Sequence, residues 1–323
     1  MRAELTDLGD GVTRVTMPLP WALDHVHCYA VAGDDGWTII DAGLGSGSTL
    51  PWWEEALAEL GDPPVHRVVI THYHPDHIGA SAGLVALTGA TEVVQGAHDA
   101  HLTELAWGED ADVDGFQQHL EMHGMPAEMA AQSTDAEERT PVHAAAPTRL
   151  VEPGDELDLD GERFRVLVLP GHADGHIALH GERSGRLFGG DVLLEEITPN
   201  VGRWPDTAPD PLGAYLRTLG EIDRMAPTRV FPGHGPVIED ARRRTAEIRE
   251  HHAERLDAHV AALRTGASAA YDVARIVWAG DGLGFHEQRF ALVEALSHLE
   301  RLEAEGRAEQ VSDARWAPRN KGV

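Results

Sequence analysis

The stretch Thr71-His72-Tyr73-His74-Pro75-Asp76-His77 decides how this chain is interpreted. It places three imidazoles and one carboxylate within six residues, directly after the apolar run 67–70. Imidazole nitrogens and carboxylate oxygens together suit zinc and the neighbouring divalent metals. The spacing of two lets the rings of His72 and His74 turn toward one point, while Asp76 and His77 can face a second point. The stretch therefore predicts a metal site.

Three further segments each place a metal-type side chain directly after an apolar run. Their candidate ligands are His172 after 166–171, Asp191 after 187–190, and His234 after 230–233. In each segment a Gly or Pro makes the tight turn that lets the backbone approach closely. The chain has 20 histidines, so one such segment would carry little weight. Three with the same layout, together with the cluster at 72–77, indicate one shared site.

The pattern of apolar residues predicts two β-rich sets with helices between them. The first set of expected strands is 12–17, 26–32, 37–41, 67–70 and 91–95, and the second is 163–169, 177–180, 186–188 and 229–231. Helices are expected at 49–60, 78–87 and 211–224. The segment 97–148 has a different composition and predicts two or three inserted helices, as a plain cap over the core or as a lid over a substrate pocket.

From residue 241 the pattern becomes helical, with helices expected at 248–263, 269–278 and 290–305. We therefore predict two domains, 1–240 with the candidate metal ligands and a small, mainly helical one at 241–323. The basic run 242–244 is expected to be a solvated helix face.

Composition limits the partners and the setting. From residue 240 onward there are 13 basic and 14 acidic residues, so the preceding segment carries almost all of the net charge of −28. A strongly acidic surface repels polyanions, which disfavours nucleic acid as a partner. No stretch approaches the roughly 20 apolar residues of a membrane span, and the N-terminus lacks a signal-peptide layout. Cys28 is the single cysteine and is expected to be buried. We expect a cytoplasmic protein.

These residues resemble the metallo-β-lactamase superfamily. The series His72, His74, Asp76, His77, His172, Asp191 and His234 matches its metal ligands in order and kind, and Asp41 in Asp-Ala-Gly matches its early Asp-x-Gly. The resemblance covers about 10–240 and implies an α+β fold, a four-layer αββα sandwich with the metals at one edge. The segments 17–25 and 281–308 are similar to one branch that carries a C-terminal, winged-helix-like module.

The resemblance also implies a role for each residue. His72, His74 and His172 would bind one Zn²⁺, Asp76, His77 and His234 a second, and Asp191 would bridge them. Asp76 and Asp191 are thereby the catalytic candidates. Asp41 and His176 would orient ligand rings, although a merely structural role suits His176 equally well. Tyr73 would contact the substrate or pack beside the site. Fe or Mn remain alternatives to zinc.

The leading functional hypothesis is a binuclear zinc hydrolase that cleaves a small ester, thioester or lactone through a metal-bridging hydroxide. The alternative enzyme is a phosphodiesterase or endoribonuclease on the same metals. The alternative of another class is a binding or regulatory protein that a metal stabilises. A small-molecule substrate is expected, without nucleic acid or membrane, and the C-terminal domain leaves room for a homodimer. The sequence does not identify the substrate.

Overall fold

The computed structural model describes residues 2–33, 36–138, 140–278 and 282–319. Residues 1, 34–35, 139, 279–281 and 320–323, which the predicted domains include, lie outside the described residues. The larger sheet has the order β1-β2-β3-β4-β5-β6-β7. Its strands are β1 (Glu4–Asp7), β2 (Val12–Pro18), β3 (His25–Val31), β4 (Trp37–Ile40), β5 (Val65–Ile70), β6 (Glu92–Gly96) and β7 (Arg149–Val151). The pairs from β1 to β4 are antiparallel and those from β4 to β7 are parallel.

The smaller sheet has the order β12-β11-β10-β9-β8. Its strands are β8 (Glu156–Leu159), β9 (Glu162–Val168), β10 (Ile177–Gly181), β11 (Arg186–Gly190) and β12 (Arg229–Pro232). Because β10 is antiparallel to both β9 and β11, and β12 is parallel to β11, the strands β9, β11 and β12 run the same way. Their carboxyl ends therefore meet at one edge of the sheet, and each end leads to a candidate ligand.

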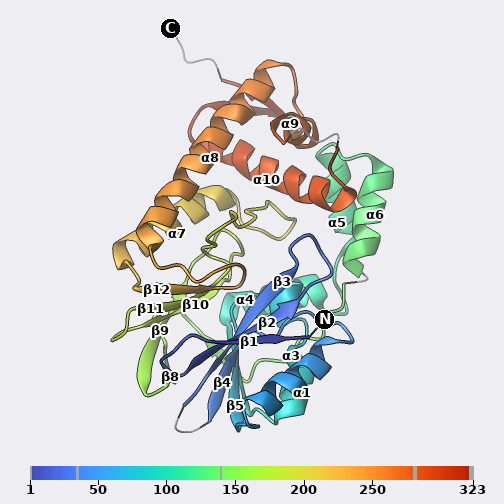
Figure 1. The fold of residues 1–323 in the computed structure, drawn as a ribbon. Helices are drawn as coiled ribbons and strands as arrows, with labels where there is room; N and C mark the ends of the chain where they lie inside the picture. The colour runs from blue at the N-terminus through green and yellow to red at the C-terminus, as the bar shows by residue number, and fades with distance from the viewer. Residues whose placement is uncertain (1, 34–35, 139, 279–281, 320–323) are drawn as a thin grey trace.

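The two sheets pack face to face, with helices on their outer faces (Figure 1). Alternation along the strands produces this layering. Ile39 and Val68 belong to a core with α1 (Thr49–Glu59) and α3 (Ser81–Thr88), whereas their neighbours Ile40 and Val69 belong to the core between the sheets. On the other side, α7 (Pro211–Met225) and α8 (Ala241–Arg264) cover the smaller sheet. The predicted mixed α+β architecture is confirmed.

Most predicted elements form, with two kinds of difference. The helix expected at 78–87 forms as α3, which begins three residues later than predicted, and a separate helical turn, α2 (Pro75–Ile78), precedes it. A Cβ on Gly79 would lie 2.6 Å from the Gly45 nitrogen, which leaves no room for a larger residue. The strands β1, β7 and β8 were not predicted because they are short and carry charged residues.

The segment 97–148 contains three helices among its described residues, namely α4 (Ala97–Trp107), α5 (Val113–Met122) and α6 (Ala127–Glu138). The C-terminal part comprises α8, α9 (Ala270–Val277), α10 (Phe285–Ala304) and the antiparallel pair β13 (Ala308–Ser312) and β14 (Arg315–Pro318). This hairpin was not predicted. Leu120, Met125 and Ala130 of the inserted segment share a core cluster with Leu292 and Val293 of α10. The inserted helices α5 and α6 therefore pack on the C-terminal part (Figure 1).

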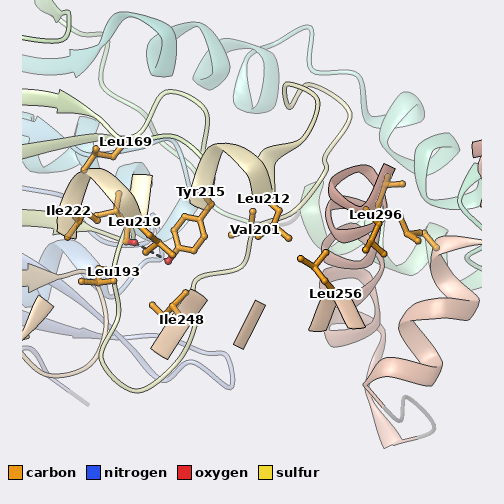
Figure 2. Packing of buried hydrophobic residues seen from close by; sticks show 14 of the residues in the cluster. Leu169, Leu193, Val201, Leu212, Tyr215, Leu219, Ile222, Ile248, Leu256 and Leu296 are labelled. Carbon is orange, nitrogen blue, oxygen red and sulfur yellow. Dashed lines mark hydrogen bonds between the residues drawn. The ribbon is translucent and has the colours of Figure 1, made fainter. Parts of the chain in front are cut away.

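One continuous core joins α7 to the C-terminal helices. Figure 2 shows Leu212 and Tyr215 of α7, Ile248 and Leu256 of α8, and Leu296 of α10 within this cluster. The boundary predicted near residue 240 therefore falls between elements that share apolar packing, and it stays a prediction.

The basic run 242–244 differs from its predicted solvated state at one position. The side chain of Arg244 is buried, and it donates hydrogen bonds to the carbonyl oxygens of Leu194 and Ile197. Arg242 and Arg243 are exposed as expected. Cys28 is buried, also as expected. Within the described residues, no helix is both long and apolar enough to span a bilayer.

Candidate metal centre

The histidine-rich stretch forms the turn between β5 and α2. Thr71 to His74 follow the end of β5, and Pro75 starts α2, where its fixed φ favours the first helical position. His72 Nε2 lies 3.0 Å from His74 Nδ1 and 3.3 Å from His172 Nε2. Nitrogens that share a tetrahedral zinc ion with bonds of ~2.0–2.1 Å are ~3.3 Å apart. These three rings therefore already have the spacing of ligands to one ion.

A second group lies beside the first and comprises Asp76, His77 and His234. His234 Nε2 is 3.4 Å from Asp76 Oδ2, and His77 Nε2 is 3.9 Å from the same oxygen. Both histidines are buried, and so is Asp76. Two imidazole nitrogens and one carboxylate oxygen thus face a second point, as the sequence spacing predicts.

Asp191 connects the two groups. Its Oδ2 lies 3.2 Å from His234 Nε2 and 3.6 Å from His172 Nε2, while its Oδ1 lies 3.5 Å from His77 Nε2. The chain reaches this position through an irregularity in β11 at Gly190, whose φ is +48°. A Cβ on Gly190 would meet His176 Nε2 and Thr71 Oγ1 at 2.8 Å, so only glycine allows this close approach.

The outward ring nitrogens of the histidines have fixed partners. His172 Nδ1 donates to the carbonyl oxygen of Asn200 at 2.8 Å, and His234 Nδ1 donates to that of His25 at 2.7 Å. His77 Nδ1 donates to Asp41 Oδ2 at 2.8 Å. A carbonyl or carboxylate oxygen can only accept, so each Nδ1 carries a proton and each Nε2 is the nitrogen that faces the centre and can bind a metal there. This is the tautomer that binds a metal through Nε2.

Asp41 and His176 both contact predicted ligands or their neighbours. Asp41 adopts a left-handed φ of +61°, and its carboxylate also accepts from the amide and hydroxyl of Thr71, each at 2.8 Å. His176 Nε2 accepts from the amide of Asp191 at 3.1 Å, and its ring stacks on that of His72 with centroids 4.5 Å apart. Both side chains are therefore placed to orient the donor set.

Tyr73 is half-buried beside this group. Its ring centroid lies 4.9 Å from that of His74, its amide donates to Asp99 Oδ1, and its carbonyl accepts from Trp107 Nε1 of α4. The inserted segment thus contacts the turn that carries the ligands. The choice between substrate contact and packing for Tyr73 stays a prediction.

The carboxylates give the centre a strong preference for positive charge. Burial alone would lower the pKa of His77 and His234, yet Asp191 and its neighbouring carboxylates hold the pKa of His77 well above its ordinary value and that of His234 at about 10. Among the described residues, His77 Nε2 and Asp191 Oδ1 are buried without a hydrogen-bond partner. A buried polar atom without a partner lowers the stability of the fold unless a bound ligand interacts with it. The residues therefore fit a divalent metal site.

Several contributing groups were missed in the sequence. The carbonyls of Asn200 and His25 come from distant loops, and no side-chain pattern reveals them. Asp99 is fully buried, and it accepts from Gln95 Nε2 and the Tyr73 amide. Burial raises its pKa to about 8, against the lowering by these two hydrogen bonds. Its place shortly after the end of β6, in the same parallel set as β5, was the available signal.

The fold and the donor set define a two-sheet sandwich with a candidate metal site at one edge. Residues 21–234 match the family model described as the metallo-beta-lactamase superfamily, and residues 256–320 match the metallo-beta-lactamase-like, C-terminal domain. The chain belongs to the metallo-beta-lactamase superfamily, and it is an enzyme of its hydrolase class. Nothing in the matches tests the winged-helix description of the C-terminal part.

Three similar proteins illustrate the relationship. The "Probable metallo-hydrolase YqjP" of Bacillus subtilis is 33% identical over 244 residues, which is 71% of this chain and 73% of that protein. The human "Acyl-coenzyme A thioesterase MBLAC2" is 28% identical over 243 residues, covering 70% of this chain and 79% of that protein. The crystal structure of a metallo-beta-lactamase family protein from Thermus thermophilus superposes with a TM-score of 0.85 at 31% identity, covering 97% of this chain and 100% of that one.

Proposed function

We propose that the protein is a binuclear zinc hydrolase that cleaves the acyl bond of a small thioester, ester or lactone. The observation that carries the proposal is the position of Asp191, whose Oδ2 lies within 3.6 Å of a nitrogen from each histidine group. A human relative named as an acyl-coenzyme A thioesterase supports thioester cleavage.

The donor atoms divide into two sets with one shared member. His72, His74 and His172 would hold one ion, Asp76, His77 and His234 the other, and Asp191 would bridge them. When bound, two zinc ions would lower the pKa of a water molecule in the site toward neutrality and would polarise the substrate carbonyl. The site then needs no serine, cysteine or lysine nucleophile.

Three side chains of the site would contribute to the reaction, namely Asp191, Asp76 and Tyr73. Burial would raise the pKa of Asp191, but His234 and His77 hold it well below its ordinary value, so the carboxylate is charged. Asp76 is charged for the same reason. As charged groups, these two carboxylates would orient the attacking water by accepting hydrogen bonds from it. We expect the Tyr73 hydroxyl, on the ring next to His74, to donate to the oxygen that becomes negative.

The acyl group would occupy a cavity next to the turn that follows His234. This cavity of about 490 Å³ is lined by Glu196, Ile197, Thr198, Arg244, Glu247 and His251. Glu196 borders the turn after His234, because a Cβ on Gly235 would lie 3.9 Å from its Oε2. The lining contains two carboxylates, Glu196 and Glu247, against the one guanidinium of Arg244, so its formal charge is negative. Such a lining favours a neutral or cationic acyl group over a polyanion.

The C-terminal part would serve packing. We propose that α8 to α10 with the hairpin β13–β14 form a winged-helix-like module, supported by the order of these elements. Its helices bury one face in the shared core with α7, and this role fits better than nucleic-acid binding.

A metal-replacement assay tests the function. The full chain is demetallated with a chelator, reloaded with zinc, and assayed on matched ester, thioester and lactone substrates. We expect acyl hydrolysis that needs zinc and is lost in Asp191→Asn. The control Asp174→Asn should keep it, because Asp174 lies between His172 and His176 in the sequence but accepts from the Ala208 amide instead. Activity that survives full demetallation, or faster cleavage of bis-p-nitrophenyl phosphate than of any acyl substrate, overturns the proposal.

A further inference from the structure

A second group of metal-type side chains lies between α8 and α10, in the C-terminal part. His252 and His259 lie seven residues apart on α8, and Glu294 and His298 lie four apart on α10. Both spacings place two side chains on one face of a helix. The three histidines are fully buried, while Glu294 is partly buried. Four titratable side chains thus face one another at a helix–helix contact outside the metal centre described above.

The donor atoms in this group are as close as those of the metal centre. His252 Nδ1 lies 3.2 Å from His298 Nε2. One donor atom from each of His252, Glu294 and His298 lies within 4.8 Å of the other two. The nitrogen–nitrogen distance falls between the 3.0 Å and 3.3 Å found around His72. Two imidazoles and a carboxylate are the ligand set of open, three-residue zinc sites.

The tautomers of two rings are fixed by the backbone. His298 Nδ1 donates to the carbonyl oxygen of Glu294 at 2.8 Å, and His259 Nδ1 donates to that of Arg255 at 2.6 Å. Each ring therefore keeps its Nε2 as a lone pair. Burial lowers the pKa of His252 to about 3 and that of His259 to about 4, so these imidazoles are neutral.

Hydrogen bonding holds the rings of His252 and His259 through one nitrogen only. His252 Nδ1 lies within hydrogen-bond distance of His298 Nε2, while neither His252 Nε2 nor His259 Nε2 has a hydrogen-bond partner in the described part of the chain. His252 can therefore carry its proton on either nitrogen without breaking a bond outside the cluster. Burial also raises the pKa of Glu294 to about 7, which shows that its charged form lacks sufficient compensation in the protein alone. A cation would supply that compensation.

We propose that His252, Glu294 and His298 bind a divalent cation of the zinc type, separate from the catalytic centre. The cation takes the lone pair of His298 Nε2, a carboxylate oxygen of Glu294, and the lone pair that His252 Nδ1 gains when its proton moves to Nε2. Atoms and protons balance, because the His252 imidazole stays neutral and only changes tautomer, while a proton on Glu294 is released to water when the cation binds. Three protein ligands leave a position for water, and α8 is thereby joined to α10.

One residue connects this site to the metal centre. Asn200 donates through Nδ2 to Glu294 Oε2 at 3.1 Å, while its carbonyl oxygen accepts from His172 Nδ1. A cation that fixes the Glu294 carboxylate also fixes the loop that holds His172. The additional site would therefore support the geometry of the catalytic centre without touching the substrate.

Zinc stoichiometry of the full chain tests the site independently of catalysis. The triple variant His72→Ala, Asp191→Asn and His234→Ala removes donors from both sets of the proposed catalytic centre, and bound zinc is counted after equilibrium dialysis. We expect the background chain to bind one equivalent of zinc that is lost when His298→Gln or Glu294→Gln is introduced into it. Cobalt substitution should give an absorption spectrum that the same two changes abolish.

His259→Gln is the matched control. His259 is buried, and its ring stacks on that of His298 with centroids 4.6 Å apart, yet it lies outside the three-donor group. The background chain with His259→Gln should still bind this equivalent of zinc. If the added variants fail to fold, the spectrum and stoichiometry of the background chain decide, since it keeps the three donors. The proposal is overturned if that chain binds no zinc, or if His298→Gln and Glu294→Gln bind as much as the control.

Discussion

The contact between Asp41 and His77 gives the sharpest test of how the centre is held. Asp41 Oδ2 accepts from His77 Nδ1 and from Thr71 Oγ1, each at 2.8 Å, and Oδ1 accepts from the Thr71 amide. In Asp41→Asn the amide oxygen can keep the Thr71 amide. The new NH₂ group then faces the N–H of His77, so this hydrogen bond is lost and two donors oppose each other.

The expected magnitude follows from that loss. A hydrogen bond to a charged group contributes ~1.5–3 kcal/mol. Removing the partner that orients a ligating histidine lowers metal affinity ~10- to 100-fold, or ~1.4 to 2.8 kcal/mol, and the two ranges agree. Backbone strain does not confuse the result, because asparagine tolerates the left-handed φ of +61° that Asp41 adopts.

The assay is a zinc competition with a chromophoric chelator. The control is Asp62→Asn, since Asp62 also has a left-handed φ, of +51°, but is exposed and lies outside the set of candidate ligands. We expect the zinc affinity of Asp41→Asn to fall within the stated range, with that of Asp62→Asn unchanged. Equal affinities for the two variants would show that Asp41 does not hold His77 for metal binding, and the reasoning would fail.

Three further predictions concern the same region. Gly233→Ala should abolish metal binding and activity, because its Cβ would lie 2.3 Å from Asp191 Oδ1 and 2.6 Å from His77 Cε1; zinc content of the folded variant is the measurement. Chelation should lower the melting temperature by several degrees, since a ligand at about 1,000 times its Kd stabilises by ~4 kcal/mol; calorimetry with and without zinc tests this. The pKa of Asp99 is raised to about 8, so its proton uptake stabilises the fold below about pH 4 and this contribution disappears as the pH rises toward 8. Asp99→Asn should therefore flatten the stability profile in this window, where the single proton contributes a slope of up to ~1.4 kcal/mol per pH unit in denaturant titrations.

The sequence predicted the parts of the fold that depend on long periodic segments. The buried strands such as β3 and β5 and the helix α7 lie within two residues of their predicted ends. The short strands β1, β7 and β8 were not predicted, because their stability comes from pairing with neighbouring strands and their own residues are charged or few. The hairpin β13–β14 was not predicted, because most of β13 is exposed and its sequence lacks alternating apolar residues.

The candidate site also has a part that could be predicted from the sequence and a part that could not. Ligand side chains such as His72 and His172 were visible because residue type and strand-end position both show in the sequence. The groups that fix their tautomers could not be predicted. Every residue has a backbone carbonyl, so the role of the Asn200 carbonyl is evident only when the position of its loop is known. Likewise, His252 and His298 are 46 positions apart and read as ordinary members of amphipathic helices. Only the packing of α8 on α10 brings them together.

The metal centre also has a mechanical consequence. Its donors come from both layers of the sandwich: His72, His74, Asp76 and His77 follow β5 of the larger sheet, and His172, Asp191 and His234 follow β9, β11 and β12 of the smaller one. An ion held by both sets acts as a cross-link between layers. Sliding of one sheet over the other would break it, so cation release and loosening of the interlayer core should occur as one event. Amide exchange in β5 and β11 would then accelerate together on demetallation.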